Sequence, residues 1–246
     1  MIINSKIRIN SDLGEGTGVE KDIMPFLNSC SIACGGHTGD KSSMTDTILI
    51  AKKYDVNIGA HPSYPDKENF GRKNISISNA DLSNSLMSQI DDLDRIARSL
   101  ETSLNHIKMH GALYNFSAND LEIASIIIEL MRFKYSDKIL YVPYGSLISE
   151  LAIENNIKIY YEVFLDRNYN NDLSLVSREN NNSMILDYQK MLKRLENVIN
   201  DNKIQTIGGD YKEISADTFC VHGDSPKIIS LIKDLFNNRN KINLNN

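Results

Sequence analysis

Four of the five histidines in this chain stand at the ends of short apolar runs, next to glycine or proline. They are His37, His61, His110 and His222. Short apolar runs closed by glycine or proline are typical of buried strands. If such strands run parallel, their last residues gather at one rim, which is where β/α barrels build their active sites. The positions of the histidines therefore predict one shared site with acid–base or ligand chemistry.

Lys108 and His110 are two residues apart in one of these runs, so on a strand their side chains face the same way. A lysine that faces the inside of a barrel is costly unless it is paired or functional. Glu162 lies within another apolar run and is a candidate partner for Lys108. The pair is either part of the site or purely structural, and the sequence leaves both interpretations open.

Two glycine-rich turns carry further candidates. The first, residues 12–18, follows the first predicted strand and brings the carboxylates of Asp12 and Glu15 to the rim. The second, residues 33–40, leads into a predicted helix whose first N–H groups favour an anion. An ordinary solvated turn is the alternative, and no G-x-x-x-x-G-K-S/T motif is present to cradle ATP. We expect these turns to form a phosphate or oxyanion loop from Gly14, Gly16, Gly35 and Gly36.

Metal binding and carboxylate binding are two further options for the rim. The histidines and Asp12 are of types that commonly bind divalent metals, although the chain lacks an H-x-x-x-H pair. Acid–base use of these residues is therefore favoured over metal binding. Arg72, in the loop after His61, could hold a carboxylate through two parallel hydrogen bonds. Serine nucleophile chemistry is disfavoured because there is no G-x-S-x-G motif.

Alternating strand and helix patterns must position these residues. Seven strands are predicted, at Ile7–Asn10, Ser31–Cys34, Asn57–Ala60, His106–Met109, Ile139–Val142, Lys158–Phe164 and Thr218–Val221. Helices are predicted between most of them, at 40–55, 78–100, 121–133 behind a Ser117 cap, 146–154, 184–200 and 225–237. Residues 204–214 are predicted to form a β-hairpin with a Gly-Gly turn. Candidate chemistry at five or more strand ends favours a closed, distorted barrel over an open doubly wound sheet.

Size and charge limit the class of protein. The 246 residues, 41% of them hydrophobic, predict a single α/β domain over residues 1–246 with the last few residues frayed. A net charge of −5 gives no electrostatic basis for binding nucleic acid or an anionic membrane. The three cysteines argue against a disulfide framework and for a cytoplasmic protein. The sequence shows neither an apolar stretch of transmembrane length nor the apolar core of a secretory signal.

Taken together, the motifs resemble the LamB/YcsF family, the A subunit of the bacterial ATP-dependent 5-oxoprolinase. The matching blocks, in the family's order, are DLGEG (12–16), ACGGHTGD (33–40), GAHPSYPD (59–66), FGR (70–72), KMHGALYN (108–115), EVFLDRNY (162–169) and CVHGD (220–224). The resemblance implies a distorted seven-stranded parallel β/α barrel related to polysaccharide-deacetylase-like folds. It also implies cleavage of 5-oxoproline to glutamate at the expense of ATP, together with B and C subunits.

The motifs supply two sets of candidate residues. The catalytic set is Asp12, His37, His61, Lys108 and His110. The substrate-binding set is Glu15, Asp40, Arg72, Tyr114, Asn115, Glu162, Asp166, Arg167, His222 and Asp224. We expect an arginine or lysine to hold the substrate carboxylate or a developing anion, and an aspartate with one histidine to move protons.

The absence of a phosphate-binding motif implies that ATP is bound either partly by the partner subunits or at a site that no known motif marks. A divalent metal and a homo-oligomer both stay open. Two alternatives from other classes remain, a metal-dependent amide hydrolase or deacetylase that acts alone and a non-catalytic substrate-binding subunit.

Overall fold

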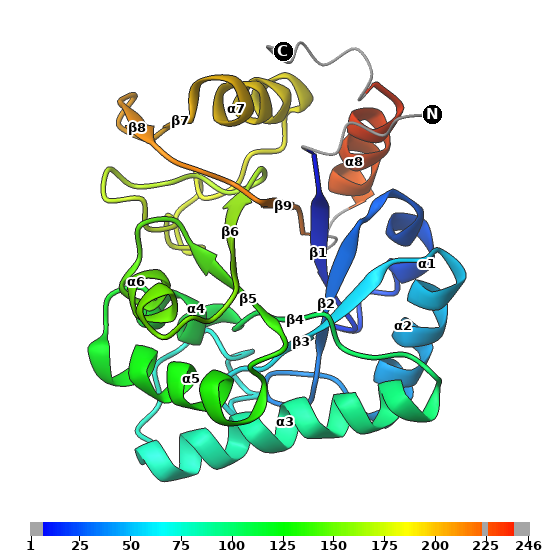
Figure 1. The fold of residues 1–246 in the computed structure, drawn as a ribbon. Coiled ribbons are helices and arrows are strands. Elements are labelled where there is room, and N and C mark those ends of the chain that lie inside the picture. Colours follow the sequence, from blue (N-terminus) through cyan, green and yellow to red (C-terminus); the bar gives the residue numbers. More distant parts are fainter. Residues whose placement is uncertain (1–6, 223–225, 239–246) are drawn as a thin grey trace.

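A closed barrel of parallel strands forms the centre of the computed structural model, which describes residues 7–222 and 226–238 (Figure 1). Within these residues seven strands close the barrel in the order β1(Ile9–Leu13), β2(Ser29–Ala33), β3(Asn57–His61), β4(His106–Ile107), β5(Ile139–Pro143), β6(Ile159–Phe164) and β9(Thr218–Cys220). The predicted seven-stranded parallel β/α barrel is thereby confirmed, with boundaries that shift by a few residues.

Strand β9 closes the barrel because it pairs on both sides. Its Phe219 is in register with Ile9 of β1 on one side and with Val163 of β6 on the other. Each of the other strands pairs with its neighbours in sequence order. The first and last strands of the chain are thus adjacent, and all carboxyl ends point to the same rim.

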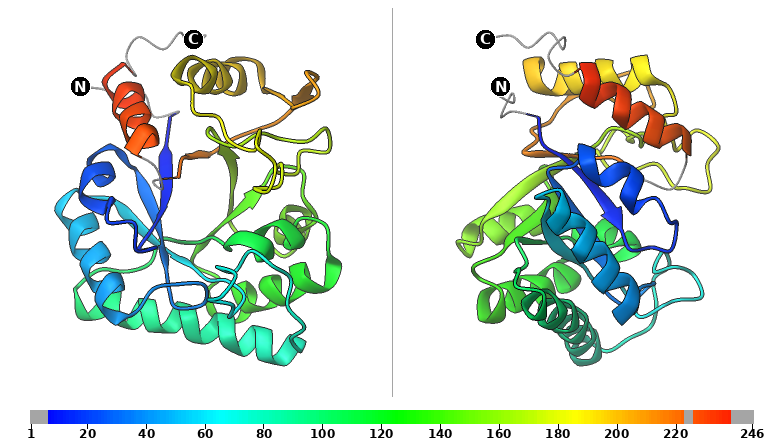
Figure 2. Two further views of the ribbon diagram at one scale, coloured as in Figure 1. Left: turned by 180° about the vertical axis from the view of Figure 1, so that it is seen from behind. Right: turned by 90° about the vertical axis from the view of Figure 1, so that its right-hand side faces the viewer.

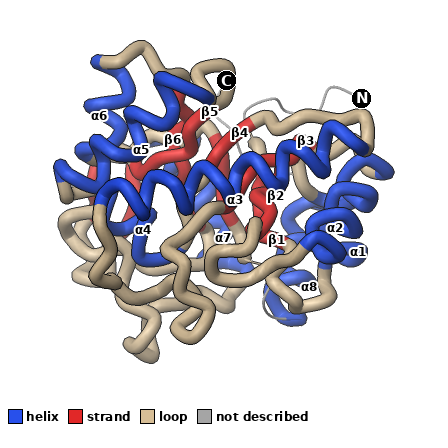
Figure 3. Tube along the Cα trace, turned by 90° about the horizontal axis from the view of Figure 1, so that it is seen from below, coloured by secondary structure: helices blue, strands red, loops and turns tan. Residues whose placement is uncertain are grey.

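Helices surround the strands (Figures 1 and 2). They are α1(Glu20–Ile23), the 3₁₀ turn η1(Met24–Phe26), α2(Lys41–Lys53), α3(Asn79–Ser99), α4(Gly111–Ser117), α5(Leu121–Lys134), α6(Leu147–Glu154), α7(Tyr188–Asp201) and α8(Pro226–Asn238). The longest, α3, runs along the outside of the barrel (Figure 3). No helix of the described part of the chain is both long and apolar enough to cross a membrane.

The sequence explains why these helices form and which face they bury. In α3 the cap is Ser78, whose side chain accepts the Asp81 N–H, as predicted. The predicted apolar stripe of α3 is buried against the barrel, and it consists of Leu82, Leu86, Ile90, Leu93 and Ala97. In α2 the cap is Asp40, which forms a reciprocal capping box with Ser43.

Several local predictions were wrong. The cap of α5 is Asp120, which accepts the Glu122 and Ile123 N–H groups, whereas Ser117 donates to the Tyr114 carbonyl inside α4. Helix α7 begins at Tyr188 instead of Met184, because Met184 is taken up in a β-bridge with Arg167. The short elements α1, η1 and α4 were not predicted. The predicted Ser225 cap and the frayed tail lie outside the described residues.

A separate antiparallel hairpin, β7(Lys203–Gln205) and β8(Tyr211–Glu213), lies between α7 and β9, as predicted from the Gly-Gly turn. The loops after β1, β3 and β6 extend from the same end of the barrel (Figure 2). These loops carry most of the motifs that the sequence singles out, so the fold brings the motifs to one rim.

Candidate active site

Lys108 lies at the centre of the barrel, just beyond β4, and connects three strands. Its Nζ is 2.9 Å and 3.1 Å from the two carboxylate oxygens of Asp12 on β1. It forms an ion pair with Glu162 Oε1 on β6 at 2.8 Å, and it is 3.3 Å from Cys220 Sγ on β9. The Lys108 side chain is 2% exposed, so this ion pair is shielded from water. The predicted partnership of Lys108 with Glu162 is confirmed as an ion pair.

The pair of Lys108 and Asp12 is held in its charged form. Burial by itself would lower the pKa of Lys108, but Asp12, Cys220 and Glu162 raise that pKa well above its ordinary value. Burial would raise the pKa of Asp12, but His61 and Lys108 hold that pKa well below the usual range. At neutral pH the site therefore contains a fixed ammonium beside a fixed carboxylate.

Three histidines lie next to Asp12 on the side of the rim. His61 Nε2 is 3.4 Å from Asp12 Oδ2 and 3.0 Å from His110 Nδ1. The His37 ring stacks on the His110 ring, with centroids 3.6 Å apart and planes 2° from parallel. Glu15 Oε1 is 3.1 Å from His37 Nε2 and 3.6 Å from His110 Nδ1. The three rings and two carboxylates form one contiguous cluster.

Burial keeps two of these rings neutral. It lowers the pKa of His37, although the hydrogen bond to Glu15 acts in the opposite direction. It also lowers the pKa of His110 well below the ordinary value, and the neighbouring His61 and His37 rings lower it further. For Glu15, burial would raise the pKa, but the His37 hydrogen bond and the charge of His61 lower it. The cluster thus offers neutral imidazoles beside ionised carboxylates, a combination suited to proton transfer.

The fourth histidine, His222, lies on the other side of Asp12. Its Nδ1 and its backbone N–H both donate to Asp166 Oδ2, at 2.9 Å and 2.8 Å. Its Nε2 is 4.0 Å from Asp12 Oδ2. The predicted convergence of the four histidines is therefore seen in the structure, whereas their chemical roles stay predictions.

Four other predicted substrate-binding residues differ in burial and in contacts. Tyr114 is buried, and burial followed by the charge of Glu162 raises its pKa well above the ordinary value. Arg72 is exposed at the rim, with its guanidinium 4.8 Å from the centre of the Phe70 ring. Asn115 is exposed on α4. Arg167 is buried and donates to the Val176 carbonyl at 2.6 Å, which anchors the loop after β6.

The remaining candidates are not gathered into the cluster. Asp40 is exposed and caps α2. Two amides of the predicted oxyanion loop are already bonded within the chain, since Gly14 N–H donates to Glu20 and Gly35 N–H donates to the Thr38 carbonyl. Both would have to break these bonds to hold an anion, so Gly16 and Gly36 are the better remaining candidates for that role. Asp224 lies outside the described residues.

The structure also adds residues that sequence reasoning missed. Ser63 is fully buried, and its Oγ lies 3.1 Å from His37 Nδ1 in a hydrogen bond. The side-chain amide of Gln89 accepts the Ser63 backbone N–H and donates to the Ser63 carbonyl. The one available signal was that Ser63 follows His61 by two positions in the same block. Cys220 is buried and unoxidised, and its Sγ contacts Lys108 Nζ.

Two groups of side chains place ligand atoms close enough together to share a metal ion. They are Asp12 with Cys220 and His222, and Glu15 with His61 and His110. Burial raises the pKa of the Cys220 thiol well above its ordinary value, although Lys108 acts in the opposite direction.

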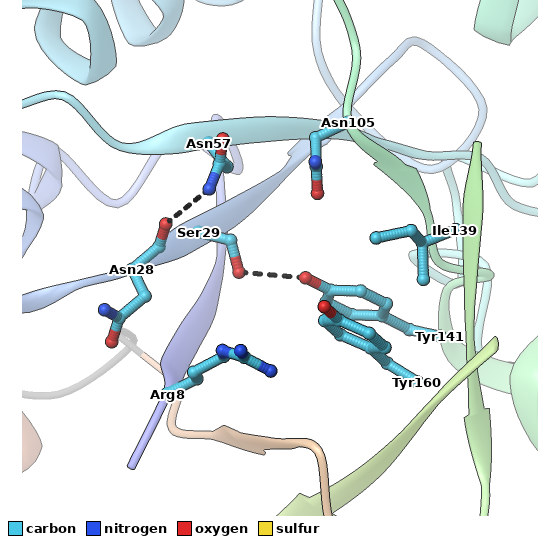
Figure 4. Close-up of a pocket in the computed structure, with 8 residues that line it drawn as sticks. All are labelled: Arg8, Asn28, Ser29, Asn57, Asn105, Ile139, Tyr141 and Tyr160. Atoms are coloured by element: carbon cyan, nitrogen blue, oxygen red, sulfur yellow. Dashed lines mark hydrogen bonds between the residues drawn. The ribbon is translucent and has the colours of Figure 1, made fainter. Parts of the chain in front are cut away.

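The amino end of the barrel has a different character (Figure 4). A pocket of about 210 Å³ opens there, lined by Arg8, Asn28, Ser29, Asn57, Asn105, Ile139, Tyr141 and Tyr160. Ser29 and Tyr141 bond each other across it at 3.1 Å, and the Arg8 guanidinium lies over the Tyr160 ring. None of its lining residues is a carboxylate or a histidine, in contrast to the opposite rim.

The fold and the site define a β/α-barrel protein with a buried Asp–Lys pair and a histidine cluster at the carboxyl ends of its strands. The model of the LamB/YcsF family matches residues 7–245, and the chain belongs to this family.

Relatives with assigned names cover nearly the whole chain. A protein of Pyrococcus horikoshii, named as the A subunit of 5-oxoprolinase, is 35% identical over 92% of this chain and 91% of its own length. The protein of the same name from Campylobacter jejuni subsp. doylei is 37% identical, over 96% and 94%. A crystal structure of the lactam utilization protein from Thermus thermophilus superposes with a TM-score of 0.86 at 27% identity, covering 96% of this chain and 97% of that one.

Proposed function

We propose that this chain is the A subunit of an ATP-dependent 5-oxoprolinase, which opens the lactam of 5-oxo-L-proline to give L-glutamate, ADP and phosphate. The observation that carries the proposal is the buried cluster around Asp12 and Lys108, in a chain similar over more than nine-tenths of its length to proteins named as the A subunit of 5-oxoprolinase. A buried ion pair, neutral histidines and a rim arginine are the groups that lactam opening needs.

The chemistry explains this need. A lactam resists hydrolysis because amide resonance weakens its carbonyl as an electrophile. Transfer of the γ-phosphoryl group of ATP to the amide oxygen would remove that resonance and leave ADP. One water would then add to the ring carbon, the C–N bond would break with protonation of nitrogen, and a second water would release the phosphate. The site must therefore take a proton from water and deliver one to the ring nitrogen.

We assign the proton transfers to the cluster. Asp12 and His61, 3.4 Å apart, are placed to take the proton of the attacking water, and His110 to return a proton to the ring nitrogen. Lys108 already contacts Asp12 and Glu162, so we propose that it positions Asp12. Arg72, exposed at the rim, is the better candidate for the substrate carboxylate.

ATP and the partner subunits complete the proposal. The chain has no phosphate-binding motif, and two of the predicted oxyanion-loop amides are bonded internally, which supports binding of ATP mainly by the B and C subunits. We expect the assembly to act in the cytoplasm on a small molecule. A metal-dependent amide hydrolase that acts alone is the second candidate, and the Glu15–His61–His110 group favours it.

Reconstitution of the chain with its two partner subunits tests the proposal. We expect glutamate release from 5-oxoproline only when all three subunits and ATP are present, with one ADP formed per glutamate. Glutamate release by the chain alone without ATP would instead support the stand-alone hydrolase. If B and C turn over at the full rate without this chain, the proposal is wrong.

A further inference from the structure

The pocket at the amino end of the barrel is large enough for a small organic molecule (Figure 4). Its volume of about 210 Å³ exceeds that of an apolar cavity of roughly 150 Å³ that accepts benzene in another protein. Pockets for drug-sized ligands are larger, at about 300–1,000 Å³. The expected occupant is therefore a molecule of roughly six to ten non-hydrogen atoms.

Three segments of the chain bring hydrogen-bonding groups into this pocket that the protein itself leaves unused. Arg8 precedes β1, Asn105 precedes β4 and Tyr160 lies on β6. Figure 4 shows these three side chains directed towards the same space. Within the described residues, neither the Arg8 guanidinium, the Asn105 amide nor the Tyr160 hydroxyl forms a hydrogen bond to another protein group. Water or a ligand must therefore satisfy them.

The charge around the pocket selects the ligand. Arg8 and Lys158 both lie over the Tyr160 ring, with the guanidinium carbon 5.4 Å and the ammonium nitrogen 5.9 Å from its centre. None of the eight lining residues is acidic, and neither cation forms an ion pair with another described residue. The whole chain carries a net charge of −5, so this uncompensated positive charge is a local exception. An anion is the ligand that such a pocket attracts.

We propose that this pocket binds a small organic acid through its carboxylate. The planar guanidinium of Arg8 offers the pair of N–H groups that matches a carboxylate. Arg8 is also the only cation among the lining residues, which suits one carboxylate charge better than the larger charge of phosphate. The amides of Asn57 and Asn105 can each donate and accept, so the remainder of the ligand is expected to be polar.

The shape of the pocket favours a free small molecule over an acidic side chain of a partner subunit. Ser29 and Tyr141, two of its lining residues, are only 5% and 4% exposed, so the pocket extends into the barrel. The ring of Tyr141 stacks on that of Tyr160, with centroids 5.7 Å apart, and the two rings form one wall. A single aspartate or glutamate side chain would fill only part of this volume. The proposed site is separate from the lactam chemistry and needs neither ATP nor a partner subunit.

Isothermal titration calorimetry on the full-length chain by itself tests the proposal. The probes are succinate, L-glutamate and inorganic phosphate, compared at one ionic strength because salt screens exposed charges. We expect at least one of the two organic acids to bind at roughly one site per chain with a Kd of about 1 mM or lower. Phosphate should bind at least about tenfold more weakly than that acid.

Four variants locate the bound acid. Arg8→Gln, at an exposed side chain, should weaken its binding at least about tenfold, and Tyr160→Phe, which keeps the ring stack, about threefold. Arg132→Gln is the matched control, because Arg132 is an exposed arginine over the Phe133 ring and does not line the pocket. Arg72→Gln, at the carboxyl end of the barrel, should also leave the affinity unchanged. Circular dichroism establishes that each variant folds.

Any of four results would overturn the proposal. Neither organic acid binds the wild-type chain; Arg8→Gln binds as tightly as Arg132→Gln; binding is lost in Arg72→Gln and kept in Arg8→Gln; or phosphate binds more tightly than both acids. If no free acid binds and Arg8→Gln instead weakens assembly with the partner subunits, an acidic side chain is the occupant and the proposal is wrong. Lactam opening by the reconstituted assembly is measured separately, so this proposal and the proposed function can fail independently.

Discussion

At the scale of the residue, the site depends on charges that are buried as compensated sets. Lys108 lies between Asp12 and Glu162, and each of the three side chains is at most 6% exposed. A buried charge that loses its partner cannot recover hydration, so these residues depend on one another. The same dependence keeps Asp12 ionised next to the histidines, which is what a proton acceptor requires.

Lys108→Met tests this mutual dependence. The change leaves two carboxylates buried without their ammonium, so we expect the free energy of unfolding to fall by about 3–5 kcal/mol. Lys134→Met is the matched control, since Lys134 pairs with Asp91 at the surface and should cost about 1 kcal/mol or less. Urea denaturation measures both. Equal losses for the two variants would mean that the buried pair contributes no more than a surface pair.

Asp166 connects the site to the pH dependence of stability. Burial would raise its pKa, but the charge, ring N–H and backbone N–H of His222 lower it. A carboxylate with a lowered folded pKa stabilises the protein above its unfolded pKa of about 3.9, and this stabilisation is lost as the pH falls through the folded value. Unfolding free energies of wild type and Asp166→Asn should therefore differ most near neutral pH and converge in acid. A difference that grows on acidification would contradict this assignment.

At the scale of the element, the packing inside the barrel depends on how closely strands β3 and β4 approach each other. Gly59 on β3 lies against the ring of His106 on β4, and a Cβ at Gly59 would come within 2.3 Å of His106 Nε2. His106 in turn stacks on Tyr141 of β5, with centroids 4.0 Å apart. Strands β3, β4 and β5 are thus packed side by side through one glycine and two stacked rings.

Gly59→Ala should destabilise the barrel by about 1–3 kcal/mol, because the added methyl group displaces the His106 ring. In a His106→Ala background the same change should cost nothing or stabilise slightly, since the clash is gone and alanine is favoured over glycine in a strand. Thermal or urea unfolding of the four proteins completes the cycle. Additive effects would show that the two residues do not press on each other.

The sequence predicted the elements better than it predicted contacts. Strand-ending histidines such as His61 could be found because glycine or proline marks the end of each buried run. Helix α4 could not, since it starts at Gly111 with a positive φ and has no side-chain cap. Asp40 was ambiguous, because an aspartate before a helix can cap it or face a ligand. The role of Arg167 depends on carbonyls of a distant loop, which no local pattern encodes.

At the scale of the whole molecule, the two ends of the barrel have different properties. The carboxyl end holds the histidine cluster with its ionised carboxylates, and the amino end holds a pocket of neutral polar groups with Arg8. Because β1 and β9 are adjacent, no strand can leave without opening the barrel. We propose that residues 1–246 fold as one domain, with its chemistry at one end and the rest of the surface free for partner subunits.

The central claim is that the buried cluster carries out the lactam chemistry of the assembly. The most direct measurement is kcat for glutamate release by the reconstituted three-subunit enzyme containing Asp12→Asn. We predict a loss of at least about 100-fold, because the variant cannot accept a proton from water. Asp46→Asn, on the exposed face of α2, is the matched control and should retain the wild-type kcat. A folded Asp12→Asn chain that supports the same kcat as Asp46→Asn would contradict the claim.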